Sequence, residues 1–210
     1  MLQGGYLLLV EGESDKHAFR HIMDSYPNTA KFEVKVCRGV DRAIELLGVL
    51  ALDENLVALG IAVDANESPS SRWCRIGEEL LSVGIRLKEK PERGGTIIEA
   101  QGYLPRIGVW ILPDNQTEGE LEDLVARMIY QDDPIWPLAK SYVDSIPVED
   151  RPFISTGTKI NKAQVYAWLA TRKKPGLIGK AIGSEALDTS VEDVRALSRW
   201  LARLFPIMND

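Results

Sequence analysis

The 210-residue chain has few cysteines and few histidines, and each scarcity excludes a class of protein. Cys37 and Cys74 are too few for a disulfide framework or a zinc knuckle, so we expect both to be reduced and the protein to be cytoplasmic. His17 and His21 are four residues apart, which suits zinc, but the sequence offers no third ligand nearby. A surface pair, or a pair beside a bound phosphate, is the better interpretation of these histidines.

Long apolar runs and an excess of positive charge are also absent. No stretch approaches the roughly 18 apolar residues of a membrane span, and no basic segment precedes an apolar one at the N-terminus, so we expect neither a membrane segment nor a signal peptide. The net charge of −6 argues against a protein that coats nucleic acid through bulk positive charge. It does not exclude a nuclease, because catalytic acids add to the negative total and bound metal ions offset it locally.

The first half of the chain alternates segments with strand and helix patterns. Strands are expected over 6–10, 32–37, 57–63, 96–100 and 107–112, and helices over 14–26, 40–52, 68–83 and 118–131. We expect Ser14 and Ser68 to be N-caps, the latter followed by Pro69, and Thr117 to form a capping box with Glu120. This alternation predicts an α/β fold with a mainly parallel sheet flanked by helices.

The pattern changes after residue 131. Four prolines between 134 and 152 interrupt the segment around a short helix, and further helices are expected near 160–171 and 189–205, the last capped by Thr189 and Glu192. The chain has no internal repeat, and no linker of the usual Gly/Ser/Pro kind separates the two parts. We therefore expect residues 1–131 to form an α/β core and residues 132–210 an α-rich extension packed on it, within one domain.

Two apolar strands run directly into acidic residues. The first ends at Val10 and continues as Glu11-Gly12-Glu13-Ser14-Asp15, and a later one ends at Val63 and continues as Asp64-Ala65-Asn66. In an α/β sheet these strand ends fall on the same carboxyl edge, where ligands bind. Carboxylates gathered there without an equally close basic residue in the sequence indicate a site for Mg²⁺ or Mn²⁺.

The other polar candidates each have a structural alternative. Asp15 also complements the dipole of a helix start, Asn66 is either a ligand or the cap of the next turn, and Asp114 is either a ligand or part of a Pro-Asp-Asn turn. Glu122 or Asp123 is the acid of the next helix that turns toward the metal.

Two lysines follow at the start of a predicted helix. Gly157-Thr158-Lys159 is similar to the end of a phosphate-binding loop, but the first glycine of that motif is missing at the required distance, so we reject this interpretation. Either Lys159 or Lys162 is a candidate to neutralise a scissile phosphate, and a solvated helix start is the alternative.

The ordered set of motifs resembles the Toprim domain of topoisomerases, DnaG-type primases and recombination-repair proteins. That domain has a Glu after its first strand and an Asp-x-Asp after a later one, here Glu11 and Asp64-Ala65-Asn66. The likeness covers about residues 5–130 and is nearest to small bacterial Toprim-like proteins of uncharacterised function and to the overcoming-lysogenization-defect nucleases. Those proteins also have a second acid, an acidic helix and a downstream lysine, which correspond here to Asp15, the segment 119–124 with Glu122, and Lys159 or Lys162.

The resemblance implies a divalent-metal-dependent nuclease that acts on DNA or RNA. Its implied metal ligands are Glu11, Asp15, Asp64, Asn66, Asp114 and Glu122, and its implied catalytic residues are Glu11, Lys159 and Lys162. It also implies an ATPase partner protein, and a homodimer is the other route by which so acidic a chain could gain affinity for nucleic acid.

One departure from the Toprim pattern keeps another class of function open. Asn66 stands where the pattern has its second Asp, and a neutral amide is a weaker ligand than a carboxylate. The alternative is a catalytically degenerate Toprim-fold binding or regulatory module. A third hypothesis is a nucleotide-binding α/β protein. It requires a Gly-rich turn after the first strand, and Gly12 alone does not supply one.

Overall fold

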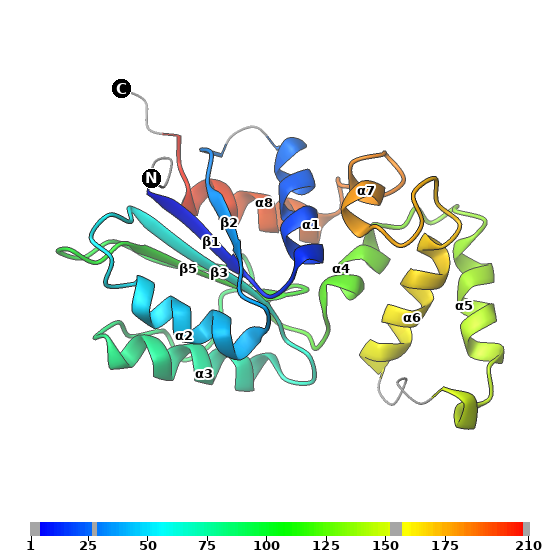
Figure 1. Cartoon of the computed structure of the whole chain (residues 1–210), viewed down its shortest axis with the longest axis horizontal. Coiled ribbons are helices and arrows are strands. Elements are labelled where there is room, and N and C mark those ends of the chain that lie inside the picture. Colours follow the sequence, from blue (N-terminus) through cyan, green and yellow to red (C-terminus); the bar gives the residue numbers. More distant parts are fainter. Residues whose placement is uncertain (1–4, 27–28, 152–156, 208–210) are drawn as a thin grey trace.

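A five-stranded sheet forms the centre of the computed structural model, which describes residues 5–26, 29–151 and 157–207 (Figure 1). The strands are β1 (Tyr6–Val10), β2 (Glu33–Val36), β3 (Ala58–Asp64), β4 (Thr96–Ile98) and β5 (Arg106–Leu112). Their order in the sheet is β2-β1-β3-β5-β4, and all neighbours are parallel except β4 and β5, which are antiparallel. The expected α/β fold with a mainly parallel sheet is therefore confirmed.

Helices cover both faces of the sheet. In Figure 1, α2 (Val40–Leu50) and α3 (Pro69–Ser82) lie below the sheet, and α1 (Glu13–Asp24) and α8 (Glu192–Leu204) lie above it. The remaining helical segments are α4 (Leu121–Met128), α5 (Trp136–Ser145), the 3₁₀ turn η1 (Val148–Asp150), α6 (Gly157–Leu169) and α7 (Ile178–Ile182). The α5–α6 hairpin stands at one end of the sheet and joins it through contacts between α6 and α4. Within the described residues, no helix is long and apolar enough to cross a bilayer.

Alternation of side chains along the strands divides the core into two layers. Leu7 and Leu9 of β1 pack with α2 and α3, while Leu8 and Val10 pack with the helices on the other face. The central strand β3 is buried on both sides, as its uninterrupted apolar sequence predicts. Each fully buried Leu or Val side chain contributes about 1.5–3 kcal/mol relative to an exposed one.

The last helix, α8, belongs to the same core as the sheet. Gly60 and Gly108 are register partners on β3 and β5, and Leu204 of α8 rests on both. A Cβ atom on Gly108 would lie 2.4 Å from Leu204 Cδ2, so the glycines permit the close approach of the helix. Trp200 of α8 packs against Trp110 of β5 with ring centroids 5.6 Å apart. The α-rich extension is thus continuous with the core at its C-terminal end.

Helix starts show where reasoning from local sequence was right and where it was wrong. Ser68 is the N-cap of α3, with its Oγ accepting the Ser71 N–H at 3.1 Å and Pro69 in the first turn, as expected. The expected N-cap at Ser14 is wrong, because α1 starts at Glu13 and Gly12 is its N-cap. The Asp15 carboxylate accepts the Gly12 N–H at 2.8 Å, so an acid replaces the hydroxyl in tying the helix start.

The two expected capping boxes are also wrong. Glu120 is the N-cap of α4, and its N–H donates to Asp123 Oδ2 at 2.7 Å. Thr117 instead donates its hydroxyl to Asp114 in the preceding turn. Helix α8 starts at Glu192 with Val191 at its N-cap position and no side-chain cap, so Thr189 plays no capping role. At α4 an acid three residues after the N-cap, Asp123, satisfies the helix start in place of Thr117, and α8 starts without any side-chain cap.

Candidate functional site

Glu11 and Asp64 lie together at the carboxyl edge of the sheet. Glu11 directly follows β1, Asp64 is the last residue of β3, and these two strands are neighbours. Glu11 Oε1 accepts the Asp64 backbone N–H at 2.9 Å. Asp64 Oδ1 in turn accepts the backbone N–H of Leu121, the first residue of α4, at 3.0 Å. The ends of β1, β3 and the start of α4 therefore meet around two carboxylates, and we call this place the acidic rim.

Asp15 joins the acidic rim from the first turn of α1. Its side chain is buried, and the tie of its Oδ2 atom to the Gly12 N–H holds it beside the β1–α1 turn. The pKa of Asp15 is raised to about 6, mainly by burial and also by the charges of Glu11 and Glu122, which together outweigh the lowering effect of the Gly12 hydrogen bond. A carboxylate in this place is thus coupled to acids from two other segments.

Asp64 is the acid of the rim whose pKa is affected by the largest number of neighbouring carboxylates. Its pKa is raised well above the ordinary 3.8, first by burial and then by the charges of Asp15, Glu11, Glu122 and Glu120. Burial likewise raises the pKa of Glu11. Among the described residues, neither of these acids nor Asp15 forms an ion pair with a lysine, arginine or histidine. The folded chain therefore holds three poorly compensated carboxylates together.

Arg72 on α3 is the basic residue whose charge acts on Glu11, and sequence reasoning missed it. Its Nε donates to the Asp64 carbonyl oxygen at 2.9 Å, its side chain is buried, and its charge lowers the pKa of Glu11, although burial outweighs that effect. The sequence signal for Arg72 was its place in the first turn of α3, on the side of the helix that is otherwise apolar. An arginine buried there needs a polar partner.

Glu120 and Glu122 lie beside the acidic rim but are neutralised. Lys162 Nζ lies 2.8 Å from Glu120 Oε2 and 3.1 Å from Glu122 Oε1, and Lys159 also binds the Glu120 carboxylate. Burial raises the pKa of Glu120, but hydrogen bonds from both lysines outweigh it and leave the pKa lowered. Burial lowers the pKa of Lys162, but Glu120 and Glu122 outweigh it and leave that pKa raised. The structure brings both candidate lysines to the expected edge of the sheet, where both contact acids.

Asn66 occupies a constrained position between Glu120 and Arg72. Its backbone has a left-handed φ of 52° and pairs with Gly119 through two hydrogen bonds of 2.8 Å. With its amide oriented to satisfy both neighbours, the nitrogen donates to Glu120 Oε1 at 3.2 Å and the oxygen accepts from Arg72 Nη2 at 3.0 Å. An amide suits this position because it donates to Glu120 and accepts from Arg72 at the same time, and a carboxylate has no donor for Glu120.

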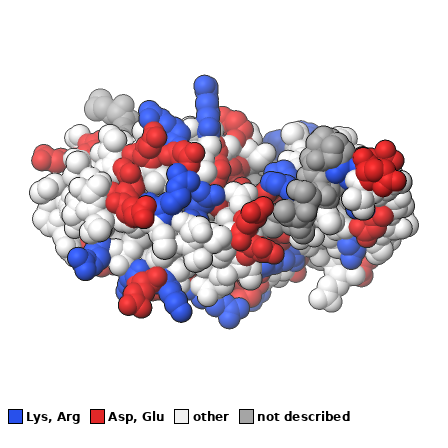
Figure 2. Space-filling model, turned by 90° about the horizontal axis from the view of Figure 1, so that it is seen from below, with Lys and Arg blue, Asp and Glu red and all other residues white. Residues whose placement is uncertain are grey.

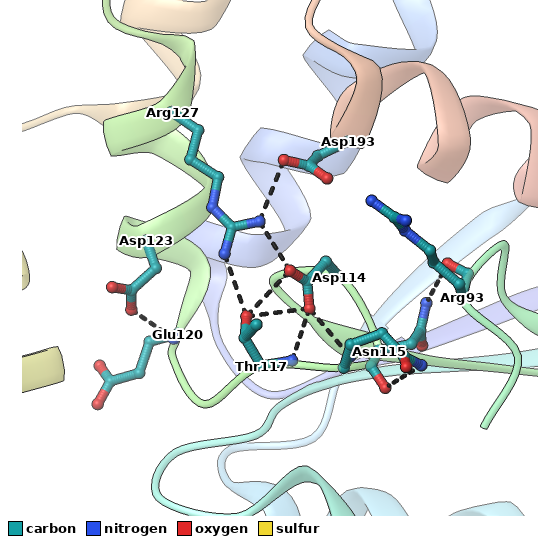
Figure 3. A network of polar contacts seen from close by, with 9 residues as sticks. Arg93, Asp114, Asn115, Thr117, Glu120, Asp123, Arg127 and Asp193 are labelled. Atoms are coloured by element: carbon teal, nitrogen blue, oxygen red, sulfur yellow. Dashed lines mark hydrogen bonds and ion pairs between the residues drawn. The ribbon is translucent and has the colours of Figure 1, made fainter. Parts of the chain in front are cut away.

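Asp114 lies in a separate polar network, shown in Figure 3. Its carboxylate accepts the Thr117 N–H and hydroxyl and an Arg127 Nη1 donor at 2.8 Å, and Arg127 also reaches Asp193 at the start of α8. Burial raises the pKa of Asp114, but these hydrogen bonds outweigh it and lower the pKa overall. The structure thus places Asp114 in a turn that ties β5 to α4 and α8, and not among the acids that perturb Asp64.

The donor set of the acidic rim fits a hydrated Mg²⁺ or Mn²⁺. In the described part of the chain, no three or more His, Cys, Asp or Glu side chains are arranged to hold a metal ion. Mg²⁺ does not require such a cage, since it keeps several waters and binds through one or two carboxylates plus substrate phosphates. Glu11 and Asp64 each engage one oxygen with a backbone N–H, which leaves the other oxygen as a donor.

The pKa of Asp15 predicts a distinctive pH dependence. Its folded value of about 6 exceeds the ordinary 3.8, so the folded state holds its proton more tightly than the unfolded state. Its contribution to stability is complete below pH 3.8 and is lost as the pH rises to about 6, a loss of about 3 kcal/mol. Urea unfolding in EDTA from pH 4 to 8 should show wild type losing stability relative to Asp15→Asn by this order. A constant difference between the two curves would contradict the coupling.

Comparisons with known proteins identify a family but no relative of known activity. A family model described as a protein of unknown function (DUF3226) matches residues 5–206. No curated protein and no solved structure matches the chain.

Proposed function

Because the chain belongs to the DUF3226 family of unknown function, whose model spans nearly all of it, we propose its function from the site itself. The protein carries out divalent-cation-dependent phosphodiester chemistry on nucleic acid. The observation that supports this proposal is the acidic rim, where burial raises the pKa of Glu11, Asp15 and Asp64, and none of the three forms an ion pair with a basic side chain among the described residues. The charge of Glu11 raises the pKa of the other two acids further.

The energetics of the acidic rim favour a role in binding a cation. Grouped carboxylates with raised pKa values cost the folded state stability at neutral pH, because burial and mutual repulsion oppose ionisation. If this edge of the sheet had only a structural role, uncharged amides could supply its hydrogen bonds, as Asn66 does. A divalent cation offsets the repulsion and stabilises the folded state in proportion to its concentration. Strongly perturbed groups of this kind cluster at functional sites.

The residues of the acidic rim have separate roles in this proposal. Glu11 and Asp64 hold the cation, and Asp15 supports them from the first turn of α1. When bound, Mg²⁺ or Mn²⁺ supplies charge stabilisation at the phosphate and a more acidic water. Arg72 fixes the Asp64 backbone, while Lys159 and Lys162, each about 40% exposed, compensate the charges of Glu120 and Glu122 beside the site.

Glu11→Gln tests the proposal directly. The amide keeps an acceptor for the Asp64 N–H but removes the charge, so we expect the rise in melting temperature caused by millimolar Mn²⁺ to disappear together with cleavage of single-stranded or duplex substrates. Asp114→Asn is the matched control, since it removes an acid outside the acidic rim and should leave the Mn²⁺ response in place. Wild type that neither gains stability from Mn²⁺ nor cleaves nucleic acid would overturn the proposal.

A binding or regulatory module is the second candidate, and two contacts favour it. Both lysines are engaged by Glu120, and the Asn66 oxygen faces Arg72 instead of the acids. In such a module the acidic rim would take a basic group of a partner, for which an ATPase or a second copy of this chain is a candidate. Wild type that shows no Mn²⁺ response but binds a basic partner, with that binding weakened in Glu11→Gln, would favour this candidate.

A further inference from the structure

A second polar site lies beside α1, against the segment 172–184. We call a cavity of about 270 Å³ the basic hollow, because four basic side chains line it together with His21 and Ser184. They are Arg172, Lys173, Lys174 and Lys180. A smaller adjoining cavity of about 100 Å³ shares His21 and Lys180 and extends to His17 and Ser14 in the first turns of α1. The basic hollow thus continues along α1 toward Asp15.

The charge of the basic hollow is concentrated in a chain that is otherwise acidic. Four of the 25 Lys and Arg residues converge on this cavity, although the net charge is −6. Among the described residues, Lys173, Lys174 and Lys180 form no ion pair, whereas Arg172 contacts Asp133 at 3.4 Å and lies over the Trp168 ring. By contrast, acidic and basic side chains are interspersed on the face seen in Figure 2. Uncompensated ammonium groups around a concavity suit a multiply charged anion such as phosphate.

The packing of α7 on α1 builds this cavity. Gly179 and Gly183 of the α7 region face His17 and His21, with the same four-residue spacing on both segments. A Cβ atom on Gly179 would lie 2.7 Å from His17 Cβ, and one on Gly183 would lie 2.6 Å from His21 Nδ1. The glycines therefore set the close approach that brings Lys180 and the loop at 172–176 beside α1. The histidine pair lies at the edge of the basic hollow, with Asp24 3.6 Å from His21 Nδ1.

We propose that the basic hollow binds the sugar–phosphate backbone of a single-stranded nucleic acid whose scissile phosphate lies at the acidic rim. This inference rests on the proposed function for the identity of the substrate. Ser14 and His21 are seven residues apart on α1, which is about 10 Å along the helix axis, a span that a few nucleotides of flexible strand can cover. The small volume admits one backbone unit and not a duplex, which would need a broad basic face.

Oligonucleotide binding in EDTA tests the basic hollow separately from cleavage. The probe is a fluorescein-labelled oligothymidylate, followed by anisotropy over a range of salt concentrations with the full chain. For the variant Lys173→Gln/Lys174→Gln/Lys180→Gln, we expect binding to weaken at least about tenfold and the salt slope to fall by about two, at ~0.7 per phosphate contact. The matched control Lys31→Gln/Lys35→Gln/Lys90→Gln removes the same charge from exposed positions elsewhere and should bind as wild type does.

The outcomes separate this inference from the proposed function. Equal losses in the two triple variants, or no loss in either, would overturn the basic hollow as a binding site. Equally tight binding of the corresponding duplex, or of heparin in place of the oligonucleotide, would overturn single-stranded nucleic acid as its occupant. If the variant of the basic hollow loses oligonucleotide binding while wild type shows no Mn²⁺ response, the hollow stands and the catalytic proposal fails. If wild type shows the Mn²⁺ response and the variant of the basic hollow binds the oligonucleotide as wild type does, the catalytic proposal stands and the hollow fails.

Discussion

Asp64→Asn is expected to stabilise the protein in EDTA while abolishing its dependence on Mn²⁺. Asparagine keeps an oxygen that can accept the Leu121 N–H, so the start of α4 should be retained. The substitution removes one charge from the group formed with Asp15, Glu11, Glu122 and Glu120. We expect a gain of about 1–2 kcal/mol in unfolding free energy at pH 8 without metal, typical of removing unfavourable charge. We expect metal-dependent cleavage to fall by about 10²–10³-fold, the usual loss for a group that stabilises developing charge.

The sign of the stability change follows from the raised pKa of Asp64. A folded state that holds this proton more tightly than the unfolded state is stabilised by Asp64 at low pH and loses that contribution as the pH rises. The advantage of Asp64→Asn in EDTA should therefore be largest at pH 8 and should shrink as the pH falls toward 3.8, the ordinary pKa of the aspartate in the unfolded state. Saturating Mn²⁺ should reverse the order at pH 8, because under the proposed function only wild type binds the cation.

Asp114→Asn is the control that gives these results their meaning. The pKa of Asp114 is lowered, so its charge stabilises the folded state above pH 3.8, and its removal should destabilise the protein at pH 8. The two substitutions make the same chemical change at the ends of the neighbouring strands β3 and β5, Asp114 lying in the turn after β5, and should shift stability in opposite directions. If Asp64→Asn also destabilises the metal-free protein, the acidic rim is a structural hydrogen-bond cluster and the proposed cation site is wrong.

The architecture was predictable because strand patterns and buried apolar runs are local signals. The uninterrupted run at 57–63 identified the central strand, and Ser68-Pro69 identified the start of α3. The antiparallel edge strand β4 had no such signal, because three residues carry too little pattern to fix a direction. The predicted helix starts were wrong where an acid at the third helical position, Asp15 or Asp123, accepts the backbone N–H of the N-cap residue. The prediction had given the capping role to Ser14 or Thr117.

The site was only partly predictable because sequence gives strand ends but not the segments that fold back onto them. Glu11 and Asp64 were found from their places after β1 and β3. The pairing of Lys159 and Lys162 with Glu120 joins segments about 40 residues apart and could not be derived from spacing. Arg72 was overlooked for the same reason. Asp114 is held apart from the other acids by its contacts with Arg127 and Thr117, which its sequence position does not reveal.

Trp200→Ala is expected to be among the most destabilising single substitutions, at about 3–5 kcal/mol. Trp200 is fully buried, lies over Gly95 and against Trp110, and donates its Nε1–H to the Thr96 carbonyl at 3.2 Å. The matched control is Trp136→Ala on α5, where the ring is half-buried under Lys140 and the loss should be well below that of Trp200.

Urea unfolding followed by far-ultraviolet circular dichroism separates two accounts of the C-terminal extension. If α8 completes the core of the sheet, Trp200→Ala should shift one cooperative transition of the whole chain, because a single hydrophobic cluster connects β1, β5, α1, α6 and α8. A shift confined to a minor transition would instead make 132–210 a separate folding unit. The basic hollow would then belong to that unit and the acidic rim to the other, so their alignment along α1 depends on the single-transition result.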